Sequence, residues 1–297
     1  MSILIDESTR VLVQGITGSQ GRFDTRYCLA YGTNIVAGVT PGRGGQDVEG
    51  VPVYNTVEAG VAASGATASV IYVPAAGIKD AVLEAVDAGI EVIVALTENV
   101  PRHDAAIAVA ATRAAGTWLI GFNTNGMISP GKSKLGGIGG DRADELYVPG
   151  RVGVCSRSGG MSAELSAALA AGGYGVSTCV SMGGDPIIGN DMSEYARQLE
   201  ADPDTDAMLF YGEPGSDLEQ GLARAMRDGE INKPVVALIA GVFQESHPKG
   251  LSFGHVAAMI RTEDDSASAK QKLLAEAGAH IAHRLGEIPE LLNQALS

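Results

Sequence analysis

The chain has 297 residues, enough for about two domains that each bury a core. Apolar residues make up 45% of the chain and charged residues 19%, which excludes a disordered protein and indicates a globular α/β protein. The formal net charge of −14 argues against general attraction to nucleic acid or to an anionic membrane surface, because both need a basic face.

The first half of the chain alternates short β-branched runs with alanine-rich amphipathic stretches. The runs predict strands at 10–15, 34–41, 67–74, 91–97 and 117–122, and the stretches predict helices at 19–32, 78–89 and 103–116. Nearly continuous hydrophobic strands joined by helical connections are typical of a parallel sheet covered on both faces. We therefore expect a Rossmann-like domain over residues 1–122.

Residues 123–150 are rich in Gly and Pro and have no sustained period, so we expect a connection there. The alternation then restarts, with strands expected at 151–156, 175–184, 206–213 and 233–241, helices at 160–173, 192–201 and 217–229, and two final helices around a short strand. A second α/β domain is expected over residues 151–297.

Three features of the sequence bear on compartment and processing. The N-terminus lacks a basic segment followed by an apolar one, and no run of about 18 apolar residues occurs, so neither a signal peptide nor a membrane span is expected. The three cysteines, Cys28, Cys155 and Cys179, lie far apart without CxxC spacing. They predict neither disulfides nor a zinc site, and a cytoplasmic location, or an equivalent reducing matrix compartment, fits best.

The glycine-rich turn at residues 15–21 stands between an expected strand and an expected helix, where main-chain N–H groups can hold a phosphate. It is not a GxGxxG sequence, so a merely tight turn explains it about equally well. The next strand ends with Thr40, Pro41 and Arg43 instead of the acid that NAD requires. Arg43 suits a ribose phosphate, as in NADP or coenzyme A, and a solvated loop arginine is the equal alternative.

A second small-residue turn, "SRSGG" at 156–160, either caps its own helix through Ser158 or binds an anion. Its repetition of the first turn favours an anion. Neither turn has the GxSxG pattern of a serine hydrolase. No GxxxxGK[ST] occurs, so nucleotide chemistry would need another chain.

Glu213 and His255 are the remaining candidates for chemistry. Glu213 follows an expected strand, where it can orient a histidine or simply stabilise the next helix N-terminus. His255 lies in the small, apolar run 250–260, where a packed core imidazole is the commoner explanation. The residues alone leave both questions open.

Eight motifs, "GITGSQG", "VTPGRGG", "LTE", "SRSGG", "GGDP", "YGEPG", "KPVVALIAG" and "FGH", occur in the order and spacing of the α subunit of succinyl-CoA synthetase, which the whole chain resembles. The resemblance implies a Rossmann-like CoA-binding domain followed by a flavodoxin-like, doubly wound ligase domain. It implies that coenzyme A is bound by the following residues: Thr17, Gly18, Ser19, Gln20, Gly21, Arg43, Leu96, Thr97 and Glu98.

The same resemblance answers the question about the histidine. It implies that His255 carries a phosphoryl group, that Glu213 supports the ring, and that Ser158, Gly159 and Gly160 bind the phosphate. The phosphoryl group would pass from ATP or GTP to a small carboxylic acid, and the thiol of coenzyme A would then displace it. The nucleotide and its Mg²⁺ would lie on a partner β subunit with an ATP-grasp domain, since no metal ligands are evident here. We also expect Gly254 to remove bulk beside the ring and the segment before His255 to be a mobile loop.

Two departures from succinate-specific relatives concern the acid. Residues 122–126 read "FNTNG" where those relatives have Pro-Asn-Cys-Pro-Gly, and Ala163 replaces a tyrosine. Together with "SRSGGMSAEL" and "SFGH", these features resemble ATP citrate lyase and citryl-CoA synthetase. Malate or citrate is therefore an alternative to succinate. Two other classes of function remain, an NADP-dependent oxidoreductase and a non-catalytic CoA-binding module. The sequence does not decide between ATP and GTP, or between an αβ complex and a larger assembly.

Overall fold

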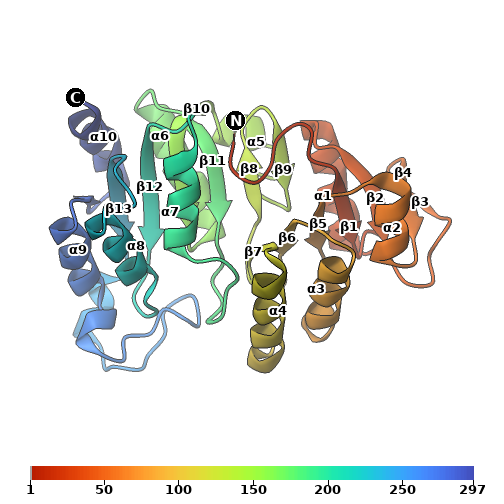
Figure 1. The fold of residues 1–297 in the computed structure, drawn as a ribbon. Helices are drawn as coiled ribbons and strands as arrows, with labels where there is room; N and C mark the ends of the chain where they lie inside the picture. Colours follow the sequence, from red (N-terminus) through yellow and green to blue (C-terminus); the bar gives the residue numbers. More distant parts are fainter. Residues whose placement is uncertain (1) are drawn as a thin grey trace.

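The computed structural model describes residues 2–297 and contains two seven-stranded sheets that lie side by side, each flanked by helices (Figure 1). The first sheet has the strand order β3-β4-β2-β1-β5-β6-β7 and is parallel except for β3. Its strands are β1 (Val11–Gln14), β2 (Ile35–Val39), β3 (Asp47–Val48), β4 (Val51–Tyr54), β5 (Ala68–Ile71), β6 (Val92–Ala95) and β7 (Trp118–Ile120). The helices of this half are α1 (Ser19–Tyr31), α2 (Val57–Ser64), α3 (Ile78–Asp87) and α4 (Arg102–Ala115).

The second sheet has the order β14-β13-β12-β10-β11-β8-β9, in which β8 is antiparallel to both neighbours. Its strands are β8 (Met127–Ser129), β9 (Ser133–Leu135), β10 (Pro149–Ser156), β11 (Val176–Ser181), β12 (Ala207–Gly212), β13 (Val235–Ile239) and β14 (His280–Ala282). The helices are α5 (Ala143–Leu146), α6 (Gly159–Ala171), α7 (Met192–Ala201), α8 (Leu218–Arg227), α9 (Ala267–Glu276) and α10 (Ile288–Leu296). Short 3₁₀ segments occur at Ala75–Gly77, Val242–Ser246, Glu263–Asp265 and Leu285–Glu287.

The α/β class expected from the sequence is confirmed, and both sheets are mainly parallel, with antiparallel pairing at β3, β8 and β9. The strands expected in both halves form as buried strands, because neighbouring strands and helices cover both of their faces. The sequence did not predict β3, β4 and α2. These elements are too short for a clear hydrophobic period, and β4 alternates buried and exposed residues as an outer strand does.

Residues 123–150, expected as a connection between the domains, contain regular elements that the sequence did not predict. This segment supplies β8 and β9 to the second sheet and also forms α5. Each of these strands has three residues, so their pairing and not a sequence pattern defines them. One cluster of buried apolar side chains runs from the first sheet through this segment into the second sheet, and includes Val13, Met127, Leu135 and Phe210.

In both sheets the first strand of the doubly wound unit lies near the centre. β1 lies between β2 and β5, and β10 lies between β11 and β12. The chain therefore reverses its direction of winding beside β1 and again beside β10. Ligands of such sheets bind in the crevice at the carboxyl ends of the strands at these points.

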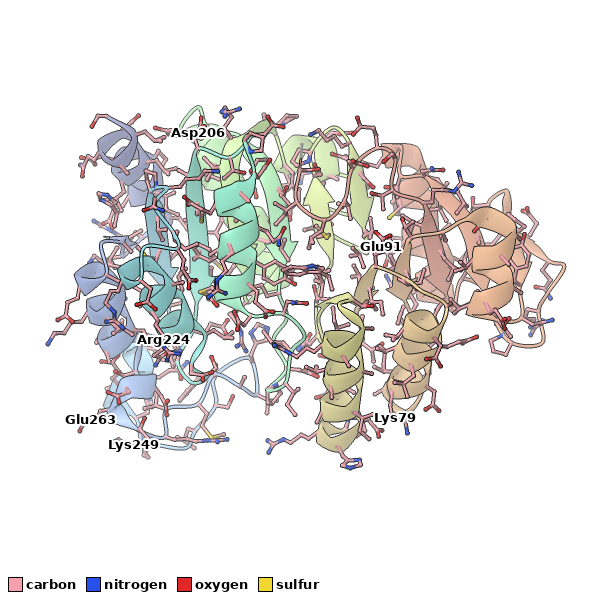
Figure 2. All side chains as sticks on the ribbon, in the orientation of Figure 1. Lys79, Glu91, Asp206, Arg224, Lys249 and Glu263 are labelled. Atoms are coloured by element: carbon pink, nitrogen blue, oxygen red, sulfur yellow. The ribbon has the colours of Figure 1, made fainter. Side chains whose placement is uncertain are left out.

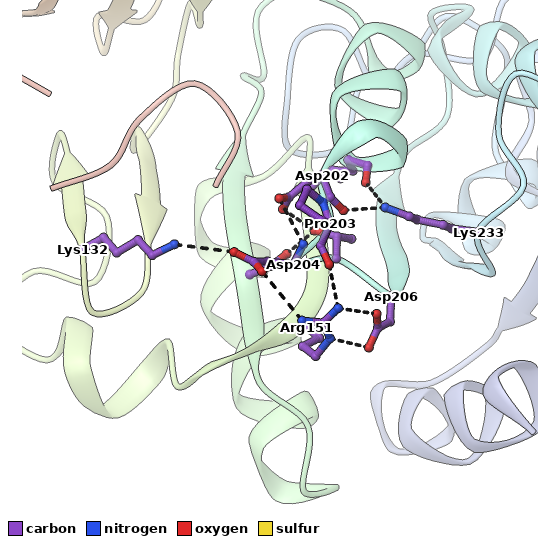
Figure 3. A network of polar contacts seen from close by, with 10 residues as sticks. Lys132, Arg151, Asp202, Pro203, Asp204, Asp206 and Lys233 are labelled. Atoms are coloured by element: carbon purple, nitrogen blue, oxygen red, sulfur yellow. Dashed lines mark hydrogen bonds and ion pairs between the residues drawn. The ribbon is translucent and has the colours of Figure 1, made fainter. Parts of the chain in front are cut away.

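The opposite, amino-terminal edge of the second sheet is held by charged side chains (Figure 3). The guanidinium of Arg151 donates to both carboxylate oxygens of Asp206, at 2.5 and 2.7 Å, and to the carbonyl of Pro203 at 2.7 Å. Lys233 donates to the carbonyls of Leu199 and Asp202. These contacts join the C-terminal end of α7 to the starts of β10, β12 and β13, at the edge away from the carboxyl ends of the strands.

Most charged side chains lie on the outside of the molecule, as Arg224, Lys249 and Glu263 do in Figure 2. Among the described residues, no helix combines the length and the apolar character that a bilayer crossing requires.

Candidate functional site

Four turns meet at the carboxyl edge of the second sheet, and each follows one of four adjacent strands. They carry Ser158 after β10, Gly184 after β11, Glu213 after β12, and the long loop with His255 after β13. Residues that are up to about a hundred positions apart are thus brought to one place because the strands are parallel.

His255 and Glu213 form a direct pair. Nδ1 of the ring lies 2.8 Å from Oε2 of the carboxylate, and the side chains are 23% and 14% exposed, respectively. A carboxylate can only accept, so it favours the tautomer in which Nδ1 carries the proton. In the part of the chain that the structure describes, Nε2 has no hydrogen-bond partner. Its lone pair is therefore available as a nucleophile.

The ring of His255 packs over the main chain of Gly184. A Cβ atom built on Gly184 would lie 2.4 Å from Cδ2 and 2.6 Å from Nε2 of the ring, a separation that real Cβ atoms do not show. In the sequence, Gly184 is part of the motif "GGDP", which by itself indicates no role for this residue. Only the tertiary contact with the ring reveals that role.

The expectation that Gly254 removes bulk beside the ring stays a prediction. Apart from its chain neighbours Phe253 and His255, no described residue would place a heavy atom within 4 Å of a Cβ on Gly254. Its φ of +95° lies in the region that L side chains rarely adopt. Gly254 therefore serves the backbone turn that delivers His255. The loop is closed by a bridge between Ser252 and Met259 and by a bond from the Gly250 N–H to the Ile260 carbonyl.

The turn before α6 combines capping with free donors. Ser158 is the N-cap residue, and its hydroxyl accepts from the N–H of Met161 at 3.4 Å. Helix α6 has no acidic residue in its first turn, so the positive end of its dipole is not neutralised there. Gly159 lies against the side chain of Asn125, where a Cβ would approach Cγ to 2.4 Å. The main chain at Gly159 and Gly160 can approach an anion closely.

Ala163 lies in the first half of α6, partly buried against the apolar core of the second sheet. It faces this core together with Met161 and Tyr174. That Ala163 leaves space for a bulkier carboxylic acid substrate stays a prediction.

The first sheet presents a second set of turns at its carboxyl edge. Thr17 follows β1 and donates to the hydroxyl of Thr40, at the end of β2, over 3.1 Å. Gly18 is the N-cap of α1 without a side-chain cap, and Ser19 and Gln20 begin the helix on the exposed surface. Gly21 packs so closely that a Cβ would lie 2.5 Å from the Gly15 carbonyl oxygen. The N-terminus of α1 therefore offers uncapped N–H groups to an anion.

The other residues that were expected to bind coenzyme A lie on the turns after β2 and β6. Arg43 is exposed, and its N–H bonds to the Thr40 carbonyl at 3.0 Å. Leu96 is half-buried after β6, and Glu98 is exposed. Thr97 donates through its hydroxyl to the Val73 carbonyl, after β5, at 2.6 Å. The strand order places all of these turns at one edge of the first sheet.

A short path of main-chain hydrogen bonds joins the two edges. The N–H of Asn123 donates to the carbonyl of Thr97 at 3.0 Å, and the N–H of Gly184 donates to the carbonyl of Asn123 at 3.0 Å. Beside this path, the buried carboxylate of Asp185 accepts from the N–H of Val100 at 3.3 Å. The turn beneath His255 is thus bonded through one residue to the turn at Thr97.

Comparisons with known proteins agree with this arrangement. Residues 6–99 match the CoA binding domain, and residues 149–293 match the succinyl-CoA ligase like flavodoxin domain. The chain is 45% identical to the α 2 subunit of an ADP-forming succinate–CoA ligase of Archaeoglobus fulgidus, over all of both chains. It is 41% identical to the α subunit of a malate–CoA ligase of Methylorubrum extorquens, over 95% of this chain and 94% of the relative.

Among solved structures, the fold is similar to that of ATP citrate lyase from Methanosaeta concilii in complex with (3S)-citryl-CoA, with a TM-score of 0.92 at 25% identity. The similarity covers 99% of this chain, which spans about half (50%) of the lyase. Both domains and full-length relatives agree: this chain belongs to the family of succinate–CoA ligase α subunits.

Proposed function

We propose that the chain acts as the α subunit of a nucleotide-dependent acid–thiol ligase in which His255 is transiently phosphorylated. One observation supports this proposal: Nδ1 of His255 is paired with Oε2 of Glu213, and Nε2, at the carboxyl edge of a doubly wound sheet, has no partner among residues 2–297. A core histidine would have both ring nitrogens satisfied or enclosed by apolar atoms.

The first step transfers a phosphoryl group to the ring. The lone pair of Nε2 attacks the γ-phosphorus of ATP or GTP, the bond from phosphorus to the bridging oxygen breaks, and the nucleoside diphosphate leaves. Glu213 accepts a hydrogen bond from Nδ1–H and stabilises the positive charge that develops on the imidazole. The N–H groups at Ser158, Gly159 and Gly160 are suited to hold the oxygens of the transferred group.

The next two steps release the histidine and form the thioester. A carboxylate oxygen of the acid attacks the phosphorus, the bond to Nε2 breaks, and an acyl phosphate forms. The thiolate of coenzyme A then attacks the acyl carbon and inorganic phosphate leaves. Splitting the acylation in this way requires His255 to meet two sites, and the segment over 240–255 is the loop that would move.

For coenzyme A we propose the turns of the first sheet. The uncapped start of α1, with Thr17, Gly18, Ser19, Gln20 and Gly21, would hold phosphate oxygens. The guanidinium of Arg43 would pair with a ribose phosphate. The turn of Leu96, Thr97 and Glu98 would face the rest of coenzyme A. This turn is the one that is hydrogen-bonded, through Asn123, to the turn beneath His255.

The nucleotide and its Mg²⁺ are proposed to lie on a β subunit with an ATP-grasp domain. The substrate is proposed to be a small di- or tricarboxylic acid: succinate in the first place, with malate or citrate as alternatives because Ala163 stands where succinate enzymes carry a bulkier side chain. The cell compartment proposed is the cytoplasm.

The test uses the chain together with its β partner. With γ-labelled ATP and Mg²⁺ we expect label on His255 only when the partner is present, and no label in the His255→Ala variant. The His247→Ala variant, changed eight residues earlier in the same loop, should retain the label. Full-rate labelling of this chain alone, or labelling of the His255→Ala complex, would overturn the two-chain phosphohistidine proposal.

A panel of succinate, malate, citrate and itaconate with the complex then identifies the acid by its kcat/KM. Thermal protection by coenzyme A, but not by NADPH, separates the ligase from an NADP-dependent oxidoreductase. Acyl-CoA synthesis that persists in the His255→Ala complex would instead leave this chain as a non-catalytic CoA-binding module.

A further inference from the structure

Behind the His255 and Glu213 pair lies a second ion pair that is wholly buried. Nζ of Lys270, on α9, lies 2.5 Å from Oε2 of Glu219, on α8, and both side chains are 0% exposed. Neither residue was singled out in the sequence, where each occurs inside an ordinary amphipathic helix.

Lys270 uses its three N–H donors on three acceptors. Besides the Glu219 carboxylate, Nζ donates to the carbonyl of Glu213 at 2.8 Å and to the carbonyl of Gly215. An ammonium has three donors and no acceptor, so its hydrogen-bonding capacity is used up. Two of the three bonds go to the backbone of the turn that presents Glu213.

Glu219 holds the same turn from its other side. Its Oε1 accepts from the N–H of Glu213 at 3.2 Å, and the carboxylate fills the space beside Gly212, where a Cβ would lie 2.2 Å from Oε1. Both the N–H and the C=O of Glu213 are therefore bonded to this one ion pair. No other described side chain bonds to the main chain of Glu213.

The turn needs such support. Gly215 has a φ of +76° and Ser216 a φ of +56°, and the latter value is unfavourable for a residue with a side chain. Without the bonds from Lys270 and Glu219, this turn would sample other backbone conformations, and the carboxylate of Glu213 would move away from the ring.

Stability alone is a weak reason to keep a buried ion pair. Desolvation of the two charges is costly, and replacement by well-packed apolar residues is often neutral or stabilising. We infer that the ion pair of Lys270 and Glu219 is a positioning device that fixes the Glu213 carboxylate against Nδ1 of His255. The inference rests on the proposed function, because the position of Glu213 matters to catalysis only if His255 is phosphorylated.

The test compares the complex with one in which both charges are replaced, Lys270→Met with Glu219→Leu. We expect the variant to fold, as judged by circular dichroism and thermal unfolding, and to phosphorylate His255 at least about tenfold more slowly, since small misplacements of a reacting group have effects of this size. The KM for ATP should stay within about twofold, because the nucleotide binds elsewhere.

A second readout does not depend on turnover. Long-range ¹H–¹⁵N spectra of His255 report which ring nitrogen carries the proton. The wild-type chain should show the Nδ1–H form, and the double variant a mixture of tautomers. If labelling of the wild-type complex fails, the proposed function is wrong, whereas the tautomer comparison still decides the positioning role.

Two further variants complete the design. If the first double variant does not fold, Lys270→Met with Glu219→Gln keeps the volumes nearly unchanged and removes only the charges and the lysine bonds. Lys134→Met is the matched control. Lys134 lies on the outer strand β9, is also buried, and donates to two main-chain carbonyls, those of Ile138 and Gly140. A folded double variant with a wild-type rate and tautomer would overturn the inference.

Discussion

Replacement of Glu213 by Ala removes one partner from a charge-assisted hydrogen bond of 2.8 Å. Bonds to charged groups contribute about 1.5–3 kcal/mol, and since the two side chains are only 23% and 14% exposed, water replaces the lost partner poorly. If this stabilisation applies mainly in the transition state, where the ring becomes positive, phosphorylation should slow roughly 10- to 150-fold at 1.36 kcal/mol per factor of ten. Glu213→Gln keeps a neutral acceptor and should fall between the wild type and Glu213→Ala.

The assay is single-turnover labelling of the complex from γ-labelled ATP, quenched in base because phosphohistidine is labile in acid. The control is Glu276→Gln, which removes an exposed carboxylate on α9 that forms an ion pair with Lys272 at 3.9 Å. A Glu213→Ala complex that labels His255 within twofold of the wild-type rate would refute the role of the carboxylate. Equal slowing in the control would point to a general effect of lost charge.

Three further predictions concern close packing and alkaline stability. Gly184→Ala places a Cβ 2.4 Å from Cδ2 of His255, so the ring must move. Phosphorylation should slow roughly 100-fold in the same assay, with little change in the thermal midpoint of unfolding. Gly21→Ala forces its Cβ against the carbonyl of the preceding turn, and calorimetry should show coenzyme A binding weakened by about 1–3 kcal/mol. Burial raises the pKa of the thiols of Cys28 and Cys179 from 9.0 to about 12, so the unfolded chain ionises first and stability is lost as the pH rises from 9 to 12. Urea unfolding should lose about 1.4 kcal/mol per thiol for each pH unit in that range, and Cys28→Ala should reduce the loss.

The two α/β sheets were predictable because buried parallel strands and their crossover helices have strong periods over enough residues. The strands β8 and β9 were not, since three residues carry no period. They belong to the sheet only because β8 pairs with β11 and β9 pairs with β8. The same limit applies to β3 and β4 at the outer side of the first sheet.

The candidate site divides in a similar way. His255, Glu213 and the turn at Ser158 could be picked out because their family motifs are local in sequence. Gly184 and Lys270 could not, since what matters is a contact made across long stretches of chain, to the ring in one case and to the turn of Glu213 in the other.

The sequence by itself determined the fold class, because hydrophobic periodicity is written along the chain. Its short motifs also pointed to the two glycine-rich turns and to His255 as candidates. The tertiary structure decided which ring nitrogen is free, which glycine lies beneath the ring, and how a buried ion pair holds the glutamate. These depend on distances between residues that are far apart in sequence, and such distances are fixed only when the parallel strands bring their carboxyl ends to one edge.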